Sequence, residues 1–325
     1  MRTADRAFGL LVLLALGSSA LLITLLAALL PRGFAVVTGG TADIASVVAV
    51  LVLILATFGV TLGLASLFRQ LLATLSLIRR LLSRRVTVSR RVGDVAARLE
   101  LAGRIDVVRD PRPFSFCYWF RRPRICLSTG LIRRLDDAEL RAVLLHERYH
   151  LRQRDPLRLV IARYFAAGLY VVPVVEELVE YYTVQKEVAA DQAAVRAMGG
   201  VRELASALFK VLPDADDVDL GLLVPVGSLS VTEARIEQLV DGRAVPLALS
   251  RASVALSGGA LAAAAVLAFA DGLHPAPLTL PALLGPASLL LAAAASGAAH
   301  QVRLVVLRPA HSYESTSLPF APRTR

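Results

Sequence analysis

Two long stretches without a charged residue constrain this chain more than any other feature of its sequence. Phe8–Leu30 and Ala45–Phe68 run for 23 and 24 residues, and about 20 apolar residues are enough to cross the hydrocarbon core of a bilayer. Ala252–Ala270 and Pro277–Ala299 are also free of charge, although they are rich in alanine. The chain is 56% hydrophobic, which is too apolar for a soluble protein of this length. We therefore predict a membrane protein with four transmembrane helices.

A cleaved signal peptide is the alternative explanation for the first apolar stretch. Signal peptides have an apolar region of roughly 7–15 residues, and Phe8–Leu30 is longer than that. A second apolar stretch also follows closely. We therefore expect the first stretch to be a retained membrane anchor.

Basic residues predict how the chain is oriented in the membrane. Of the 36 Lys and Arg residues, only Arg32 falls in the two loops 31–44 and 271–276. Six arginines lie on the other side, after the second apolar stretch and before the third: Arg69, Arg79, Arg80, Arg84, Arg85 and Arg251. Cytoplasmic loops carry such an excess of basic residues. Both termini and the large central region are therefore predicted to be cytoplasmic.

The net charge of +10 could also indicate nucleic-acid binding. The basic run from Arg69 to Arg91 is better explained by attraction to the anionic lipid of the bilayer. No basic motif with interleaved aromatic residues appears, so direct binding of nucleic acid is not expected. Cys117 and Cys126 lack CxxC spacing and are predicted to be reduced, buried thiols.

These features divide the chain into four parts. Residues 1–69 hold the first two spans, 70–251 form a cytoplasmic domain, 252–299 hold the last two spans, and 300–325 are a short tail. Within the domain, aromatic and β-branched residues predict strands at 104–108, 114–120 and 124–128, the last two as a hairpin. Helices are expected at 70–82, 92–101, 176–198, 201–212 and 233–239, with an acidic linker at 213–219.

The most specific motif is His146-Glu147-Arg148-Tyr149-His150, in the cytoplasmic domain. Residues four apart on a helix lie on the same face, so both imidazoles can bind one metal ion. HExxH on a helix is typical of zinc hydrolases, in which the glutamate is the general base. We predict that His146 and His150 bind zinc. Glu147 would accept a proton from the water that attacks a peptide carbonyl.

The ends of this helix can also be predicted. Asp136 is a suitable N-cap, and Glu139 three residues later completes an acidic capping box. Leu140, with its helical neighbours, gives the helix an apolar face. Asp155-Pro156 should end it, because proline disfavours helix in the preceding residue.

A catalytic zinc ion takes three protein ligands, so a third must come from another helix. Glu187, 37 residues after His150, is the strongest candidate. Asp191 lies one turn further on and could accept a hydrogen bond from the second nitrogen of a histidine ligand. The alternative for Glu187 is a solvated carboxylate, since other glutamates precede it closely. No donor for the oxyanion is identifiable; Tyr149, Tyr181 and Tyr182 are candidates by residue type only.

The predicted strand Arg124–Ser128 is a candidate for substrate binding. An extended peptide could pair with it and so add a strand to the sheet. The alternative is an interior strand of the domain, which would have no free edge.

The apolar segment Leu159–Val175 decides whether this ligand set is possible. If it spanned the membrane, Glu187 would lie across the bilayer from His146 and His150. The segment is short for a span, and it contains Arg163, which is costly in lipid. We therefore predict a buried or partly inserted helix that does not cross the membrane.

The stretch LDDAELRAVLLHERYHLRQRDPLRL resembles the BlaR/MecR-type family of membrane zinc metallopeptidases, whose pattern is HExxHxxRxD. Asp155 matches this pattern, and Arg152, Gln153 and Arg154 are the residues that precede it. The segments Ile125–Gly130, Glu187–Asp191 and Glu233–Leu239 are similar to the same family and to HtpX-like peptidases. The similarity covers residues 90–245.

This resemblance implies a mainly α membrane protein with four transmembrane helices and a cytoplasmic α+β, gluzincin-like zinc peptidase domain. It implies Zn²⁺ as the cofactor, with Asp155 and Asp191 as supports of the histidine ligands. Family sensors cleave a cytoplasmic winged-helix repressor, so the expected partner is a protein substrate of that kind. Those sensors carry an extracellular penicillin-binding domain, and this chain stops at Arg325 after a short tail, so β-lactam sensing is not expected. Arg235 is expected to anchor a helix through hydrogen bonds.

Three alternatives to this function stay open. An HtpX-like quality-control peptidase is disfavoured by the single short helix expected between His150 and Glu187, where two spans would be needed. A non-catalytic signalling scaffold with structural zinc would not need Glu147 as a base. A channel or transporter is disfavoured because the four apolar stretches carry no charge.

Overall fold

The computed structural model describes residues 2–38, 44–119, 121–211, 235, 246–273 and 280–306, and it is mainly helical. Its helices are α1 (Arg2–Val37), α2 (Ile44–Leu82), α3 (Arg90–Arg98), α4 (Thr129–Arg134), α5 (Asp137–Gln153), α6 (Asp155–Gly168), α7 (Val174–Met198), α8 (Arg202–Val211), α10 (Arg251–Leu273) and α11 (Leu280–Val306). Its strands are β1 (Arg85–Val86), β2 (Ile105–Val108), β3 (Ser115–Tyr118) and β4 (Arg124–Ser128). The predicted acidic linker, and the helix at 233–239 apart from Arg235, lie outside these residues.

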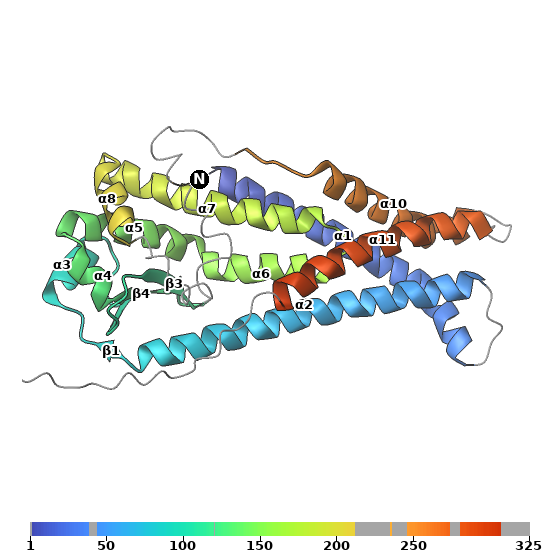
Figure 1. Cartoon of the computed structure of the whole chain (residues 1–325), viewed down its shortest axis with the longest axis horizontal. Coiled ribbons are helices and arrows are strands. Elements are labelled where there is room, and N and C mark those ends of the chain that lie inside the picture. The colour runs from blue at the N-terminus through green and yellow to red at the C-terminus, as the bar shows by residue number, and fades with distance from the viewer. Residues whose placement is uncertain are drawn as a thin grey trace, which may run out of the picture.

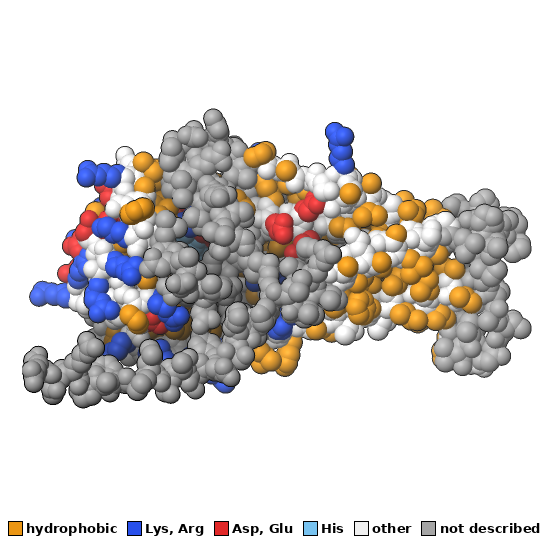
Figure 2. All heavy atoms as spheres, in the orientation of Figure 1, with side chains coloured by type: hydrophobic (Ala, Val, Ile, Leu, Met, Phe, Trp, Pro, Cys, Tyr) orange, Lys and Arg blue, Asp and Glu red, His pale blue; other side chains and the backbone are white. Residues whose placement is uncertain are grey.

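Helices α1, α2, α10 and α11 come together at the end of the molecule that lies away from the sheet (Figure 1). Two apolar stretches, Thr3–Pro31 in α1 and Ser46–Leu82 in α2, are long and apolar enough to cross a bilayer, judged by length and composition. Helices α10 and α11 pack against each other, and α10 also packs against α1. Apolar side chains gather on the surface at this end, whereas Lys and Arg gather at the other (Figure 2). This distribution is that of a membrane protein; the four-span topology stays a prediction.

Helix α2 joins the apolar half to the small sheet. It is continuous for 39 residues, which confirms the prediction that residues 70–82 extend the second apolar stretch. Near its end, Ile78 and Leu81 are buried against Val108, Tyr118 and Cys126 of the strands. The sheet therefore rests directly on the extension of a membrane helix.

The sheet has four strands in the order β1-β2-β4-β3. Strands β3 and β4 pair antiparallel, with Cys117 opposite Ile125, so the predicted hairpin is confirmed. Strand β4 also pairs with β2, in parallel. It therefore lies inside the sheet, and β3 is an edge strand next to α5.

Helix α5 begins as its sequence predicts, and it ends just before the predicted Asp155-Pro156, although Asp155 itself starts α6. Asp136 accepts a hydrogen bond from the Glu139 backbone at 2.8 Å, and Glu139 accepts one from the Asp136 backbone at 2.8 Å, which confirms the capping box. The helix ends at Gln153, and Arg154 takes the left-handed conformation with φ of 55°. Leu140 and Leu144 are fully buried in the core that α5 shares with α3, α4, α8 and the sheet.

Residues 159–175 do not form one continuous helix. Helix α6 ends at Gly168 and α7 begins at Val174, so the chain turns back in between. The two helices pack against each other, and the hairpin packs against α1 and α2. The non-spanning prediction agrees with this arrangement, but the segment contains two helices instead of the expected one.

Close backbone contacts hold the end of this hairpin. A methyl group on Gly59 would lie 2.6 Å from the Gly168 carbonyl oxygen, and one on Gly297 would lie 1.8 Å from that of Tyr170. The Tyr170 hydroxyl donates to the Leu55 carbonyl at 3.1 Å. Helices α2 and α11 therefore need glycine where they meet the hairpin.

The hairpin is also bonded to the start of α10. Glu177 accepts hydrogen bonds from the Ser250 backbone at 3.0 Å and from the Ser253 hydroxyl at 2.6 Å. The Ser257 hydroxyl accepts one from the Val174 backbone at 3.1 Å. Helix α7 therefore supplies a cap for the first turn of an apolar helix that follows it much later in the chain.

We expect Gly59→Leu to lower the thermal unfolding temperature of the detergent-purified protein. The larger side chain would force α2 and α6 apart, and overpacking of this kind costs about 1–3 kcal/mol. Gly17→Leu is the matched control, because a methyl group on Gly17 would meet no atom within 4 Å. Equal unfolding temperatures for the two variants would contradict the close-contact explanation.

We expect Asp106→Asn to destabilise the domain in a pH-dependent manner. Asp106 is 1% exposed and pairs with Arg85 at 2.7 Å and with Arg124. Burial alone would raise the pKa of Asp106, but hydrogen bonds from Arg124 and Tyr118 hold it below its usual value. The stabilisation that ionised Asp106 gives to the folded domain is therefore complete above the unfolded-state pKa, about 3.9. It is lost as pH falls through the lower folded-state pKa.

Thermal unfolding of the variant and the wild type from pH 8 down to pH 3 tests this prediction. The deficit, about 3 kcal/mol for a broken buried pair, should be constant near neutrality and shrink in acid. Asp137→Asn is the control, since its ion pair with Arg91 is exposed and worth little. A deficit that grows toward acid would show that the sign is wrong.

Candidate metal centre

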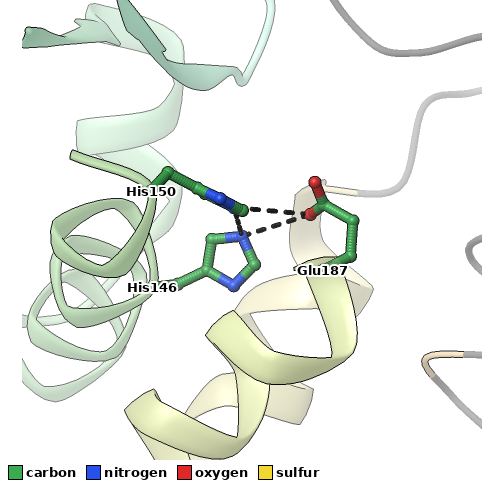
Figure 3. A group of neighbouring side chains, drawn as sticks. All are labelled: His146, His150 and Glu187. Carbon is green, nitrogen blue, oxygen red and sulfur yellow. Dashed lines mark hydrogen bonds and ion pairs between the residues drawn. The ribbon is translucent and has the colours of Figure 1, made fainter. Parts of the chain in front are cut away.

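Three of the predicted site residues meet between α5 and α7 (Figure 3). The Nε2 atoms of His146 and His150 are 3.0 Å apart. Glu187 Oε2 lies 3.4 Å from His146 Nε2 and 3.6 Å from His150 Nε2. One ligand atom from each residue lies within 4.8 Å of the others. Two imidazole nitrogens and one carboxylate oxygen therefore point at a common position.

The helices explain how these groups come together. His146 and His150 are four residues apart on α5, so one face of the helix carries both. Each is 7% exposed. Glu187 is on α7, which packs directly against α5. The turn between α6 and α7 places it on the same side as the histidines, as the ligand set requires.

Each histidine is held from behind by a carboxylate. His146 Nδ1 donates to Asp191 Oδ1 at 2.8 Å, and His150 Nδ1 donates to Asp155 Oδ2 at 2.7 Å. These bonds fix the orientation of each ring and leave Nε2 facing the cluster. Asp191 and Asp155, the two residues predicted to support the histidines, thus each bind one of them. The Tyr182 hydroxyl donates in turn to Asp155 at 3.3 Å.

Arg235 extends the support of His146. Its Nε donates to Asp191 Oδ2 at 2.7 Å and its Nη2 donates to Asp191 Oδ1 at 2.8 Å. The guanidinium therefore binds both oxygens of this carboxylate, while Asp191 also holds the histidine. Arg235 was expected to form hydrogen bonds, and it forms them with a residue of the site itself. Its distance from the other site residues in the sequence did not indicate this contact.

Glu147 lies beside the edge strand. The Ser115 hydroxyl donates to Glu147 Oε1 at 2.7 Å, and the Cys117 thiol donates to the Glu147 carbonyl oxygen at 3.1 Å. Ser115 and Cys117 alternate on β3 and therefore share one face of the strand. Sequence reasoning did not find Ser115, because no local pattern indicates that β3 packs on this turn of α5.

The charges around the cluster favour a cation. Burial alone would lower the pKa of His146 and of His150, but the neighbouring carboxylates Asp191, Asp155 and Glu187 outweigh it. They raise the pKa of His146, and they raise that of His150 to about 10. Negative charge close to both rings therefore favours a positive charge at the position they share.

Two of the three tyrosines considered as oxyanion donors have other roles. Tyr149 packs against Ala4, Ala189 and Ala190. Tyr182 is fully buried and bonds to Asp155. The Tyr182 hydroxyl is therefore not available to a substrate carbonyl, and the Tyr149 ring serves the packing of α5 against α1 and α7.

Comparison with known proteins agrees with this geometry. A protease HtpX homolog of Moorella thermoacetica is 29% identical over 145 residues, which cover 33% of this chain and 48% of the relative. The chain thus matches about half the length of that protein. The sequence model described as BlaR1 peptidase M56 matches residues 31–239, which hold α5, α7 and all four strands. Because this match covers most of the chain, the protein belongs to the M56 family of BlaR1-type membrane peptidases.

Proposed function

We propose that this protein is a zinc endopeptidase of the bacterial cell membrane that cleaves a cytoplasmic or membrane-associated protein. The observation that carries the proposal is the convergence of His146, His150 and Glu187, with ligand atoms within 4.8 Å of one another. Membership of a peptidase family supports the same activity.

The residues present fit zinc well. Two neutral imidazoles and one carboxylate form a ligand set that catalytic zinc sites use, and such sites keep a further position open. Each ring is oriented by its own carboxylate, as is usual for metal-binding histidines. Zinc, when bound, supplies Lewis-acid activation of water and of the peptide carbonyl.

Glu147 would act as the general base and acid. Its carboxylate accepts a proton from the attacking water and returns that proton to the leaving amine nitrogen. The Ser115 hydroxyl holds Oε1, so the other oxygen, Oε2, is the one we assign to proton transfer. A structural zinc site would need no such base, which argues against the scaffold alternative.

The edge strand β3 is the natural place for an extended substrate. One side of β3 pairs with β4, and within the described residues no strand pairs with its other side. A peptide added there would form main-chain hydrogen bonds and lie next to Glu147. Strand β4, the candidate that the sequence suggested for this role, is excluded because it is paired on both sides.

The two comparisons favour different substrates. Membership of the BlaR1-type family favours a winged-helix repressor and hence a role in signal transduction. The similarity to an HtpX homolog favours quality control of membrane proteins. The sequence predicted a single short helix between His150 and Glu187, which spoke against an HtpX-like peptidase. This argument no longer holds, because α6 and α7 form a hairpin there. We favour the repressor, with both termini and the peptidase domain in the cytoplasm.

We expect the purified protein to contain one zinc ion per chain, and Glu187→Ala to lose most of it. Elemental analysis after zinc repletion and removal of free metal measures this content. Glu180→Ala is the matched control, since Glu180 lies on the same helix and is exposed. Wild-type protein without zinc would refute the proposal, and full zinc in Glu187→Ala would refute the assigned ligand.

We expect Glu147→Gln to retain zinc and lose proteolysis, by about 100- to 10,000-fold, the usual contribution of a general base. New protein N-termini that appear in cells with the wild type, and not with this variant, would identify the substrates. Cleavage of one DNA-binding repressor would support signalling, whereas cleavage of many membrane proteins would support quality control. No difference between the two strains would support the non-catalytic scaffold.

A further inference from the structure

The two lysines of this chain stand out, because the other basic residues are all arginine. Lysine occurs at Lys186 and Lys210 only, among 36 Lys and Arg residues. Lys210 is half-exposed and pairs with Glu139 at 2.6 Å. Lys186 is buried, with 7% of its surface exposed, and directly precedes the candidate ligand Glu187. A buried lysine is unusual and needs a partner.

That partner is Glu187 itself. The ammonium nitrogen of Lys186 lies 3.1 Å from Glu187 Oε1. The other oxygen, Oε2, is the one that faces the two histidines, at 3.4 and 3.6 Å. The two oxygens of one carboxylate are therefore assigned to different neighbours.

The neighbouring carboxylate shows the contrast. Asp191 supports His146 and binds the guanidinium of Arg235 through both oxygens. Arginine presents a planar fork that binds carboxylates in this two-point manner, whereas the lysine ammonium is a compact point charge. A fork placed on Glu187 would occupy the oxygen that faces the histidines. The Lys186 ammonium neutralises the carboxylate from Oε1 and does not occupy Oε2.

A second cation lies on the other side of Glu187. Arg235 Nη1 is 3.9 Å from Glu187 Oε2, which is farther than the Nε2 atom of either histidine. The short contact with a basic group is therefore the one that Lys186 makes to Oε1.

We propose that Lys186 is a positioning residue for the metal centre: it holds Glu187 Oε1 and so leaves Oε2 alone to bind the metal through one oxygen. This inference rests on the proposed zinc site. It gives a reason for lysine at this position, in a chain whose basic residues are nearly all arginine: an ammonium contacts the carboxylate at one point, whereas a guanidinium is a two-point fork.

Two variants of Lys186 separate this role from simple charge neutralisation. Lys186→Arg keeps the charge, but its fork should compete for Oε2 and weaken zinc binding by about 10- to 100-fold, the usual effect of altering a supporting residue. Lys186→Met frees Oε1, so both oxygens should reach the metal. Lys210→Arg and Lys210→Met are the matched controls and should bind zinc as the wild type does.

Zinc affinity is measured on the full-length, metal-free protein in detergent by competition with a chelator, and cobalt substitution reports the coordination number. Four-coordinate Co²⁺ absorbs visible light more strongly than five- or six-coordinate Co²⁺, so we expect a weaker spectrum for Lys186→Met. Thermal unfolding checks that each variant is folded. Both predicted effects together, absent from the controls, support the proposal.

Three results would overturn it. Wild-type zinc affinity in Lys186→Arg would show that the charge alone matters. Wild-type affinity and cobalt spectrum in Lys186→Met, with slower peptide cleavage, would place Lys186 against the substrate instead. A wild-type protein that binds neither metal would remove the zinc site itself, and this failure of the proposed function is distinct from the first two results.

Discussion

The site depends on one geometric constraint: a residue 37 positions after His150 must return to the level of the two histidines. The hairpin of α6 and α7 meets this constraint because its two helical arms are nearly equal in length. Helix α6 has 14 residues and runs outward for about 21 Å, and the stretch of α7 from Val174 to Glu187 returns for about 20 Å. Glu187 therefore arrives at the level at which the hairpin began, next to Asp155 and the histidines. Glycines at the far end allow the hairpin to pack tightly among the apolar helices.

The apolar helices and the site form one connected structure. Helix α2 lies under the sheet, and the first turns of α1 lie beside the site, where Asp5 pairs with Arg158 at 2.8 Å. Phe8 packs against Tyr182, with ring centres 5.2 Å apart. Tyr182 in turn bonds to Asp155, the support of His150. The peptidase site is therefore built partly from membrane helices, and contacts of both α1 and α2 contribute to its position.

Local features were predictable from the sequence, and the structure shows why. The HERYH helix, its capping box and the β3–β4 hairpin depend on residues close in sequence, so their patterns indicate them directly. Strand β4 was harder to place, since its parallel pairing with β2 joins segments that are separated in sequence and no local pattern sets it. For residues 159–175 the sequence predicted one helix, whereas the structure has a break between α6 and α7. Gly168, at this break, lies against Gly59 and Gly63 of α2, and no local pattern indicates that contact.

The same distinction applies to the site. The histidines and Glu147 follow from one motif, and Glu187 and Asp191 from helical spacing. Ser115, Lys186 and the bidentate contact of Arg235 could not be predicted, because each depends on which elements pack together. Asp155 came from the family pattern and not from its physical role, which only the hydrogen bond to His150 reveals.

Zinc K-edge X-ray absorption of the purified, full-length protein tests the central claim most directly, since it reports which atoms surround the metal. The arrangement of His146, His150 and Glu187 predicts two imidazole nitrogens and oxygen donors at about 2.0–2.2 Å, with no sulfur. A sulfur neighbour at about 2.3 Å would indicate a cysteine ligand such as Cys117, and a shell without imidazole would exclude the histidines. Either result would contradict the site described above.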